Sequence, residues 1–279
     1  MAGLVRRVRR RFASTRRKPL PRVPDVSGKR FLFLGGLHRS GTSVLHRVLR
    51  EHDGISGFTD TPAQQDEGQH LQTVYPNVIR AGGPGRFAFY PENHITEHSP
   101  LVSPENIDRL LREWCAYHEL DKPVLLEKSP PNLIRSRFLQ AMFQRSYFVF
   151  VIRHPIPVAL ATRKWSSTTA TELMLHWSIA HSLMMSDRQH LANCLMVRYE
   201  DLVRSPAGTL AGICRFAGLD EFRFGESIED RNEEYFRDWT EFESGAMEDF
   251  KASFPGVWAF MEQFGYKLES PFVNDPGTL

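Results

Sequence analysis

Four short apolar runs, separated by longer segments with helical periodicity, constrain the fold of this chain more than any other feature. The runs are FLFLGG at 31–36, PVLLEK at 123–128, YFVFVIR at 147–153 and LMVRYE at 195–200. A run in which successive side chains are all apolar is typical of a strand buried on both faces, as in a parallel sheet between two layers of helices. The pattern therefore predicts an α/β fold with a three-layer, doubly wound parallel sheet.

The segments between these runs predict helices and two less regular parts. Apolar stripes at helical spacing are formed by Val44, Leu45, Val48 and Leu49, by Leu133, Ile134, Phe138 and Met142, and by Leu173, Trp177, Ala180 and Met184. SPAGTLAGICRFAG predicts a further helix, with Ser205 as its N-cap and Gly218 as its C-cap. Residues 53–103, rich in Gly, Pro, His and acids, indicate an irregular insertion that faces the substrate, and residues 236–266 indicate a helical cover.

The net charge of +2 conceals two regions of opposite charge. Residues 1–30 carry eleven Lys or Arg against one acid, a balance of +10, whereas the rest carry 24 against 32, a balance of −8. We expect residues 1–30 to be a basic, disordered tail and residues 31–279 to form a single domain. Weak contact with an anionic membrane and an organelle transit peptide are alternatives for the tail, and no specific nucleic-acid partner is expected.

Cysteine content and hydropathy indicate the compartment. Cys115, Cys194 and Cys214 lie far apart without metal-ligand spacing, and the chain holds no Asn-x-Ser/Thr sequence. No apolar run approaches the roughly 20 residues of a membrane-spanning helix. We therefore expect a soluble, cytoplasmic protein without a bound metal.

Polar residues follow each apolar run, where a doubly wound sheet binds its ligands. The first run is followed by Arg39, Ser40, Gly41, Thr42 and Ser43, and the others by Lys128, Arg153 and Tyr199. Cationic side chains at the ends of three strands, together with the backbone amides of a helix start, predict an anion-binding site.

The first loop has the glycine spacing of the ATP-binding pattern G-x-x-x-x-G-K-[ST], from Gly36 to Gly41, but Thr42 replaces the lysine. That replacement argues against a P-loop kinase or NTPase, which stays one alternative. A non-catalytic nucleotide-binding module is the other.

These motifs resemble those of the sulfotransferases that use 3′-phosphoadenosine 5′-phosphosulfate (PAPS). The similar segments are RSGTS at 39–43, LEKSPPNL at 126–133, VIRHPIPVALAT at 151–162 and VRYEDL at 197–202. The resemblance is greater to the protein-tyrosine and carbohydrate branch, because the C-terminal Arg-Lys-Gly segment of the cytosolic small-molecule branch is missing.

The resemblance implies a P-loop-like fold that binds PAPS as the sulfuryl donor without a metal. Residues 39–43 would hold the 5′-phosphosulfate, Arg153 the 3′-phosphate, and Tyr199 would lie near the nucleotide. The family pattern has a serine eight residues after the arginine, where this chain has Ala161. Either the hydroxyl of Thr162 or the charges of Arg163 and Lys164 would compensate.

The implied reaction moves the sulfuryl group to a hydroxyl or amine of a small-molecule, carbohydrate or peptide acceptor and leaves 3′,5′-ADP. Lys128 and Arg39 would stabilise the transition state. The resemblance places the general base after the first helix, which leaves Glu67 and Asp60 as candidates, with Glu67 preferred over Asp60. Asp66 and His70 are further candidates.

Overall fold

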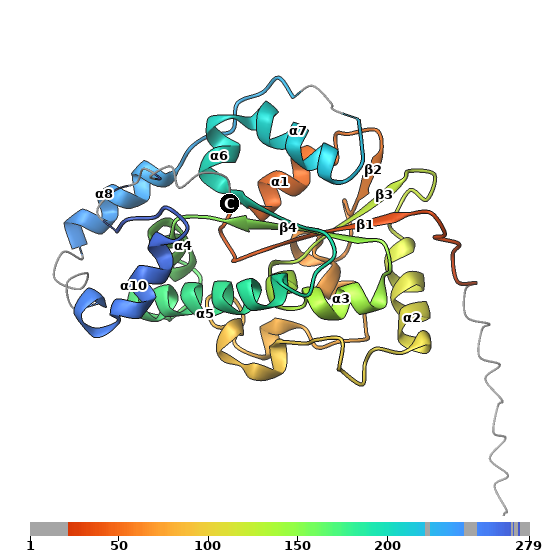
Figure 1. The fold of residues 1–279 in the computed structure, drawn as a ribbon, viewed down its shortest axis with the longest axis horizontal. Helices are drawn as coiled ribbons and strands as arrows, with labels where there is room; N and C mark the ends of the chain where they lie inside the picture. Colours follow the sequence, from red (N-terminus) through yellow and green to blue (C-terminus); the bar gives the residue numbers. More distant parts are fainter. Residues whose placement is uncertain (1–21, 221–223, 243–249, 269, 271–272, 274–279) are drawn as a thin grey trace, which may run out of the picture.

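The fold is a single parallel sheet between two layers of helices, which confirms the predicted class (Figure 1). The computed structural model describes residues 22–220, 224–242, 250–268, 270 and 273. The strand order is β2-β3-β1-β4-β5, formed by β1 (Arg30–Gly36), β2 (Ile55–Gly57), β3 (Val124–Lys128), β4 (Ser146–Ile152) and β5 (Cys194–Arg198). Four strands coincide with the apolar runs. The edge strand β2 was not predicted, because its three residues are too few to show a period.

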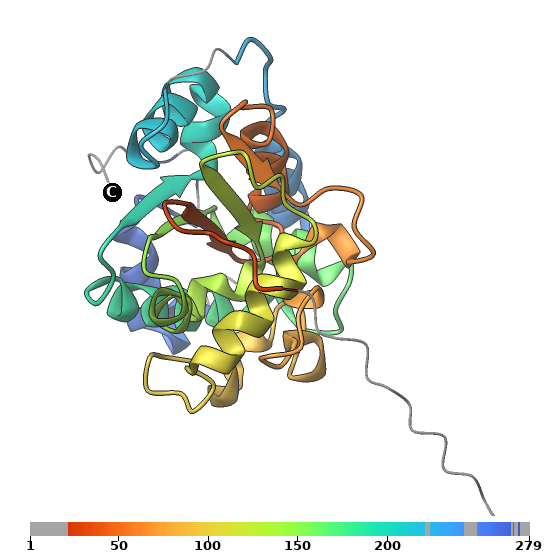
Figure 2. The same cartoon turned by 90° about the vertical axis from the view of Figure 1, so that its right-hand side faces the viewer.

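The central strand β1 explains the two hydrophobic cores, one on each face of the sheet. It pairs with β3 on one side and with β4 on the other, and its side chains alternate between the faces. Phe31 and Phe33 pack into an aromatic core with Trp114, whereas Leu32 and Leu34 pack into an aliphatic core. Figure 2 shows the helices above and below the sheet.

The helices divide between the two cores. α2 (Pro104–Cys115), α3 (Ser136–Met142) and α5 (Ala170–Arg188) contribute residues to the aromatic core, and α1 (Thr42–Leu49) and α7 (Pro206–Phe216) to the aliphatic core. Further helices are α4 (Pro155–Arg163) and α6 (Tyr199–Arg204), and the predicted C-terminal cover includes α8 (Asn232–Phe242) and α10 (Pro255–Glu262).

Two details of the predicted helices were wrong. The stripe of Leu133, Ile134, Phe138 and Met142 is divided between the 3-10 helix η6 (Pro130–Ile134) and α3, because Arg135 between them leaves the helical conformation at φ −126° and ψ 7°. Ser205 precedes α7, but its side chain makes no capping hydrogen bond. Gly218 follows the C-cap residue Ala217 and has φ 67°, a conformation that favours glycine.

Residues 53–103 are irregular, as predicted, and side-chain amides hold them together. Apart from β2 they contain five 3-10 helices, which are η1 (Gln64–Asp66), η2 (Gly68–His70), η3 (Val78–Arg80), η4 (Phe87–Phe89) and η5 (Pro91–Asn93). The Gln72 side chain donates to the carbonyls of Gln69 and Tyr75 and accepts from the amides of Val74 and Tyr75. Such bonds satisfy the backbone groups that a regular ladder would otherwise pair.

The last residues of the segment predicted as a basic tail contact the folded domain. Arg30 is the first residue of β1, and its guanidinium donates to the carbonyls of Ala217 and Gly218 at 2.8 and 2.6 Å. Lys29 donates to the carbonyl of Lys122 at 3.1 Å. The last two cations of residues 1–30 therefore join the fold, whereas residues 1–21, on which the prediction of disorder falls, lie outside the described residues.

Candidate functional site

The loop between β1 and α1 takes a conformation that only particular residues allow. Arg39 has φ 71° and Gly41 has φ 100°, both in the left-handed region. A Cβ atom at Gly41 would lie 2.5 Å from Cδ2 of Tyr199. Glycine therefore lets the Tyr199 ring lie directly against the loop, at the start of α1. The buried hydroxyl of Ser40 has no hydrogen-bond partner among the described residues.

Arg153, at the end of β4, joins this loop to the C-terminal cover. Its Nη1 donates to the carbonyl of Arg39 at 2.9 Å, and its Nε donates to Oδ1 of Asn232 at 2.8 Å. Its guanidinium carbon lies 4.2 Å from the centroid of the Tyr199 ring. Three residues that the sequence placed at the donor site, Arg39, Arg153 and Tyr199, are thus in one place.

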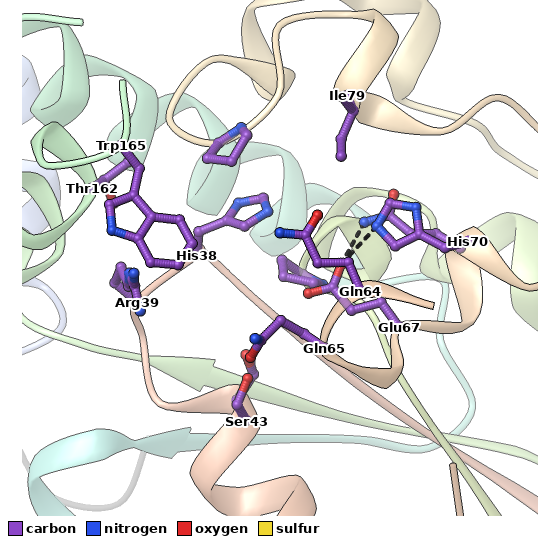
Figure 3. A pocket seen from close by; sticks show the side chains of 14 residues that line it. His38, Arg39, Ser43, Gln64, Gln65, Glu67, His70, Ile79, Thr162 and Trp165 are labelled. Carbon is purple, nitrogen blue, oxygen red and sulfur yellow. Dashed lines mark hydrogen bonds and ion pairs between the residues drawn. The ribbon is translucent and has the colours of Figure 1, made fainter. Parts of the chain in front are cut away.

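A pocket opens beside the loop, lined by residues of the loop, of the insertion and of the end of α4. It holds about 700 Å³ of empty space, which includes space open to solvent. Figure 3 shows Arg39 and Trp165 on one side and Glu67 and His70 on the other. The Arg39 guanidinium lies 3.6 Å from the centre of the Trp165 ring. Other lining residues include Thr42, Ser43, Gln69, Ile79 and Thr162.

Glu67 is the carboxylate of this pocket, and its surroundings fix its orientation. Its side chain is buried, its Oε2 accepts from Nε2 of Gln69 at 2.7 Å, and its Oε1 lies 3.4 Å from Nζ of Lys128. Lys128 is only 1% exposed and also donates to the carbonyl of Gln65 at 2.7 Å. Lys128 and Glu67 thus lie together in the interior, where each is the other's partner of opposite charge.

The four candidate bases are separated by the fold. Glu67 and His70 line the pocket, whereas Asp60 and Asp66 do not. Asp60 is exposed and accepts only from Thr59 among the described residues, and Oδ1 of Asp66 accepts from the amide and hydroxyl of Thr61, which closes the local turn. Burial lowers the pKa of His70, and Lys128 lowers it further against the opposing effect of Glu67, so its imidazole is neutral near pH 7.

Beneath the pocket, Glu127 anchors the turn that carries Glu67. Its carboxyl accepts from the hydroxyl of Ser129 and from the side-chain amide of Asn132, and the Ser129 hydroxyl accepts from the amide of Gln69 at 3.0 Å. Burial raises the pKa of Glu127 to about 7. The sequence does not predict the hydrogen bond between Ser129 and Gln69, because the two residues are 60 positions apart.

Trp165 and Gln69 line the pocket but were not predicted as site residues. Trp165 is 61% exposed and lies just after α4, the helix that follows Arg153. Its position next to the cations Arg163 and Lys164 was the sequence signal that could have identified it as a site residue. Thr162 lines the pocket, whereas Tyr199 lies behind the loop and donates to the carbonyl of Glu229 at 3.0 Å.

Among the described residues, no group of three or more His, Cys, Asp or Glu is arranged to hold a metal, and no helix has the length and apolarity needed to cross a bilayer.

The site thus consists of a pocket at the strand ends that Arg39 and the start of α1 line, with Arg153 bonded to the Arg39 carbonyl and Lys128 paired with Glu67 behind the lining. Ligands of doubly wound α/β proteins bind at this edge of the sheet. The Sulfotransferase family model matches residues 32–223, and the chain belongs to this family, which confirms the resemblance inferred from its motifs.

Curated relatives include protein-tyrosine sulfotransferase A of Caenorhabditis elegans, 22% identical over 200 residues that cover 68% of this chain and 50% of the relative. Protein-tyrosine sulfotransferase 2 of Gallus gallus is 23% identical over 201 residues, 67% of this chain and 51% of the relative. The chain thus spans about half the length of these relatives. The sulfotransferase domain of the Synechococcus PCC 7002 olefin synthase has the same fold, with a TM-score of 0.50, 18% identity and coverage of 88% of this chain and 98% of that domain.

Proposed function

We propose that this protein transfers the sulfuryl group of PAPS to a hydroxyl acceptor and releases 3′,5′-ADP. The observation that carries the proposal is the hydrogen bond from the Arg153 guanidinium to the Arg39 carbonyl. It supports the proposal because the arginine that the resemblance assigns to the 3′-phosphate lies next to the loop that the resemblance assigns to the 5′-phosphosulfate.

The loop and the start of α1 would hold the 5′ end of the donor. Thr42 and Ser43 line the pocket at the N-terminus of an eight-residue helix, where backbone amides and hydroxyls favour an anion. Arg39 reaches the same pocket and supplies the positive charge that a lysine supplies in ATP-binding loops. Burial lowers the pKa of Arg39, but the guanidinium remains protonated at neutral pH.

The residues of the pocket suit an in-line transfer. Glu67 would accept the proton of the acceptor hydroxyl while the acceptor oxygen forms a bond to sulfur. The bond from sulfur to the bridging oxygen of the phosphate breaks at the same time, and Lys128 and Arg39 neutralise the charge on the leaving 5′-phosphate. Nζ of Lys128 lies 3.4 Å from Oε1 of Glu67, so the proposed base and the proposed cation are neighbours in this site. No step of this scheme uses a metal ion.

A peptide or protein acceptor is the finer proposal, supported by the names of the curated relatives. The mouth of the pocket is compatible with it, since Trp165 and Ile79 are 61% and 53% exposed and offer an apolar rim. Cytoplasmic localisation and a membrane contact of the basic tail stay predictions.

Ligand-dependent thermal unfolding of the full chain tests the proposal. We expect 3′,5′-ADP to raise the melting temperature more than ATP or magnesium-ATP at equal concentration, because tighter binding to the folded state stabilises it more. A larger rise with magnesium-ATP would favour the kinase or NTPase alternative. Binding of 3′,5′-ADP without any sulfate transfer to acceptors from labelled PAPS would favour the non-catalytic alternative.

A further inference from the structure

Arg153 retains an unused hydrogen-bond donor although it is buried. Its side chain is 7% exposed, and while Nε and Nη1 are engaged by Asn232 and by the Arg39 carbonyl, Nη2 is buried without a hydrogen-bond partner among the described residues. An unpaired N–H of a buried guanidinium is energetically costly, and an anion beside it would remove that cost.

The Tyr235 ring lies near Arg153, and a second cation, Lys164, lies near the same ring. The centroid of the Tyr235 ring is 5.8 Å from the Arg153 guanidinium carbon and 4.9 Å from Nζ of Lys164. Tyr235 belongs to α8, which packs against α4 (Figure 1). Two positive groups therefore converge on one half-buried ring whose hydroxyl is a hydrogen-bond donor.

Lys164 lies one helical turn after Ala161, the position at which the family motif has a serine hydroxyl. Ala161 stands where the family motif has a serine, and Lys164 is three residues further on, in the same helical conformation at the end of α4. Residues three apart share a helix face, and side chains lean toward the N-terminus, so Lys164 extends back toward Ala161. Thr162 faces the pocket lined by Arg39 and Trp165.

We propose that Lys164 and Tyr235 complete the site for the 3′-phosphate of the donor. Nη2 of Arg153 and the Tyr235 hydroxyl donate hydrogen bonds to the phosphate, and the Lys164 ammonium balances its second charge. The inference rests on the proposed function and deepens it. It also makes α8 part of the donor site, although Asn232 and Tyr235 lie beyond residues 32–223, which the family model matches.

Calorimetric titration of the full chain with 3′,5′-ADP and with 5′-AMP tests the proposal, because these ligands differ only in the 3′-phosphate. We expect Lys164→Ala to weaken 3′,5′-ADP about tenfold and Tyr235→Phe about fivefold, with 5′-AMP binding unchanged. Arg109→Ala is the charge control: it removes an equal charge from an exposed position on α2 and should leave the ratio of the two affinities unchanged. Thermal unfolding of each variant checks that the fold is retained.

The outcomes separate this inference from the proposed function. A wild-type protein that does not prefer 3′,5′-ADP over 5′-AMP overturns both. If the wild type shows the preference and Arg153→Ala abolishes it, but Lys164→Ala and Tyr235→Phe leave it intact, only the present inference fails. An equal loss in Arg109→Ala and Lys164→Ala also overturns it, since the effect is then one of overall charge.

Discussion

The donor side and the acceptor side of the pocket are built in different ways. On the donor side, Arg39, Thr42 and Arg153 follow directly from β1 and β4, and the sheet register sets their positions. On the acceptor side, Glu67 lies on a turn between two 3-10 helices that is held by the side chains of Gln69, Ser129 and Lys128. The positions of the donor-side residues therefore depend on the whole sheet, whereas the position of Glu67 on the acceptor side depends on a few side-chain hydrogen bonds. Changes on the two sides should therefore have different consequences.

The largest expected effect falls on catalysis alone. Glu67→Gln keeps the size of the side chain and one of its two acceptor oxygens but removes its basicity, so turnover should decrease by about 10³-fold. Affinity for 3′,5′-ADP should remain within about twofold, because Glu67 belongs to the acceptor side. Steady-state transfer from labelled PAPS and calorimetry measure the two quantities. Asp60→Asn is the control and should retain full turnover; loss of turnover there instead would move the base to Asp60.

Arg153→Ala should have the converse effect. The substitution removes a charged hydrogen-bond donor to the ligand, and it also removes the hydrogen bonds that the guanidinium donates to Asn232 and to the Arg39 carbonyl. We therefore expect 3′,5′-ADP to bind about 100-fold more weakly. Binding of 5′-AMP should change much less. Calorimetry with both ligands measures this, and an equal loss for both would show that Arg153 supports the loop rather than the 3′-phosphate.

Gln72→Ala probes how the acceptor side is held. The substitution removes four hydrogen bonds to the local backbone, and we expect the free energy of unfolding to decrease by about 2 kcal/mol. The KM for the acceptor should rise while the affinity for 3′,5′-ADP stays constant. Chemical denaturation and transfer kinetics measure these changes. Weakened donor binding would contradict the independence of the two sides.

The smallest expected effect concerns pH and the donor side. His154 is fully buried, and burial lowers its pKa to about 3. Its Nε2 lies 2.9 Å from the carbonyl of Lys267 and its Nδ1 accepts from the amide of Ile156, so the folded state disfavours the protonated ring. The unfolded state binds a proton below pH 6.5 and the folded state does not, so stability is lost as the pH falls from 6.5 toward 3.

Between pH 7 and pH 5 this residue should remove about 2 kcal/mol from the free energy of unfolding. The His154→Gln variant should show a correspondingly smaller loss over that range, whatever its absolute stability, as measured by denaturation at each pH. His98→Gln, which alters an exposed imidazole, should keep the wild-type slope. A wild-type slope in His154→Gln would contradict the assignment.

The donor side could be predicted from the sequence more completely than the acceptor side. Arg39 and Arg153 lie within a few residues of the end of an apolar run, so finding the strands also located both arginines. The acceptor side has no such rule. Glu67 and Asp60 are both acids of one irregular segment, and only the buried pairing of Glu67 with Lys128, 61 residues away, distinguishes them.

The sequence by itself determined the layers of the fold, four of its five strands and the cationic strand ends, because burial on both faces of a sheet leaves a pattern within a few consecutive residues. Only the tertiary structure decided that Glu67 enters the pocket, that Trp165 stacks on Arg39 and that Tyr235 of α8 lies near Arg153. These are contacts between residues distant in the chain, formed by the packing of irregular segments, and no local period of the sequence records them.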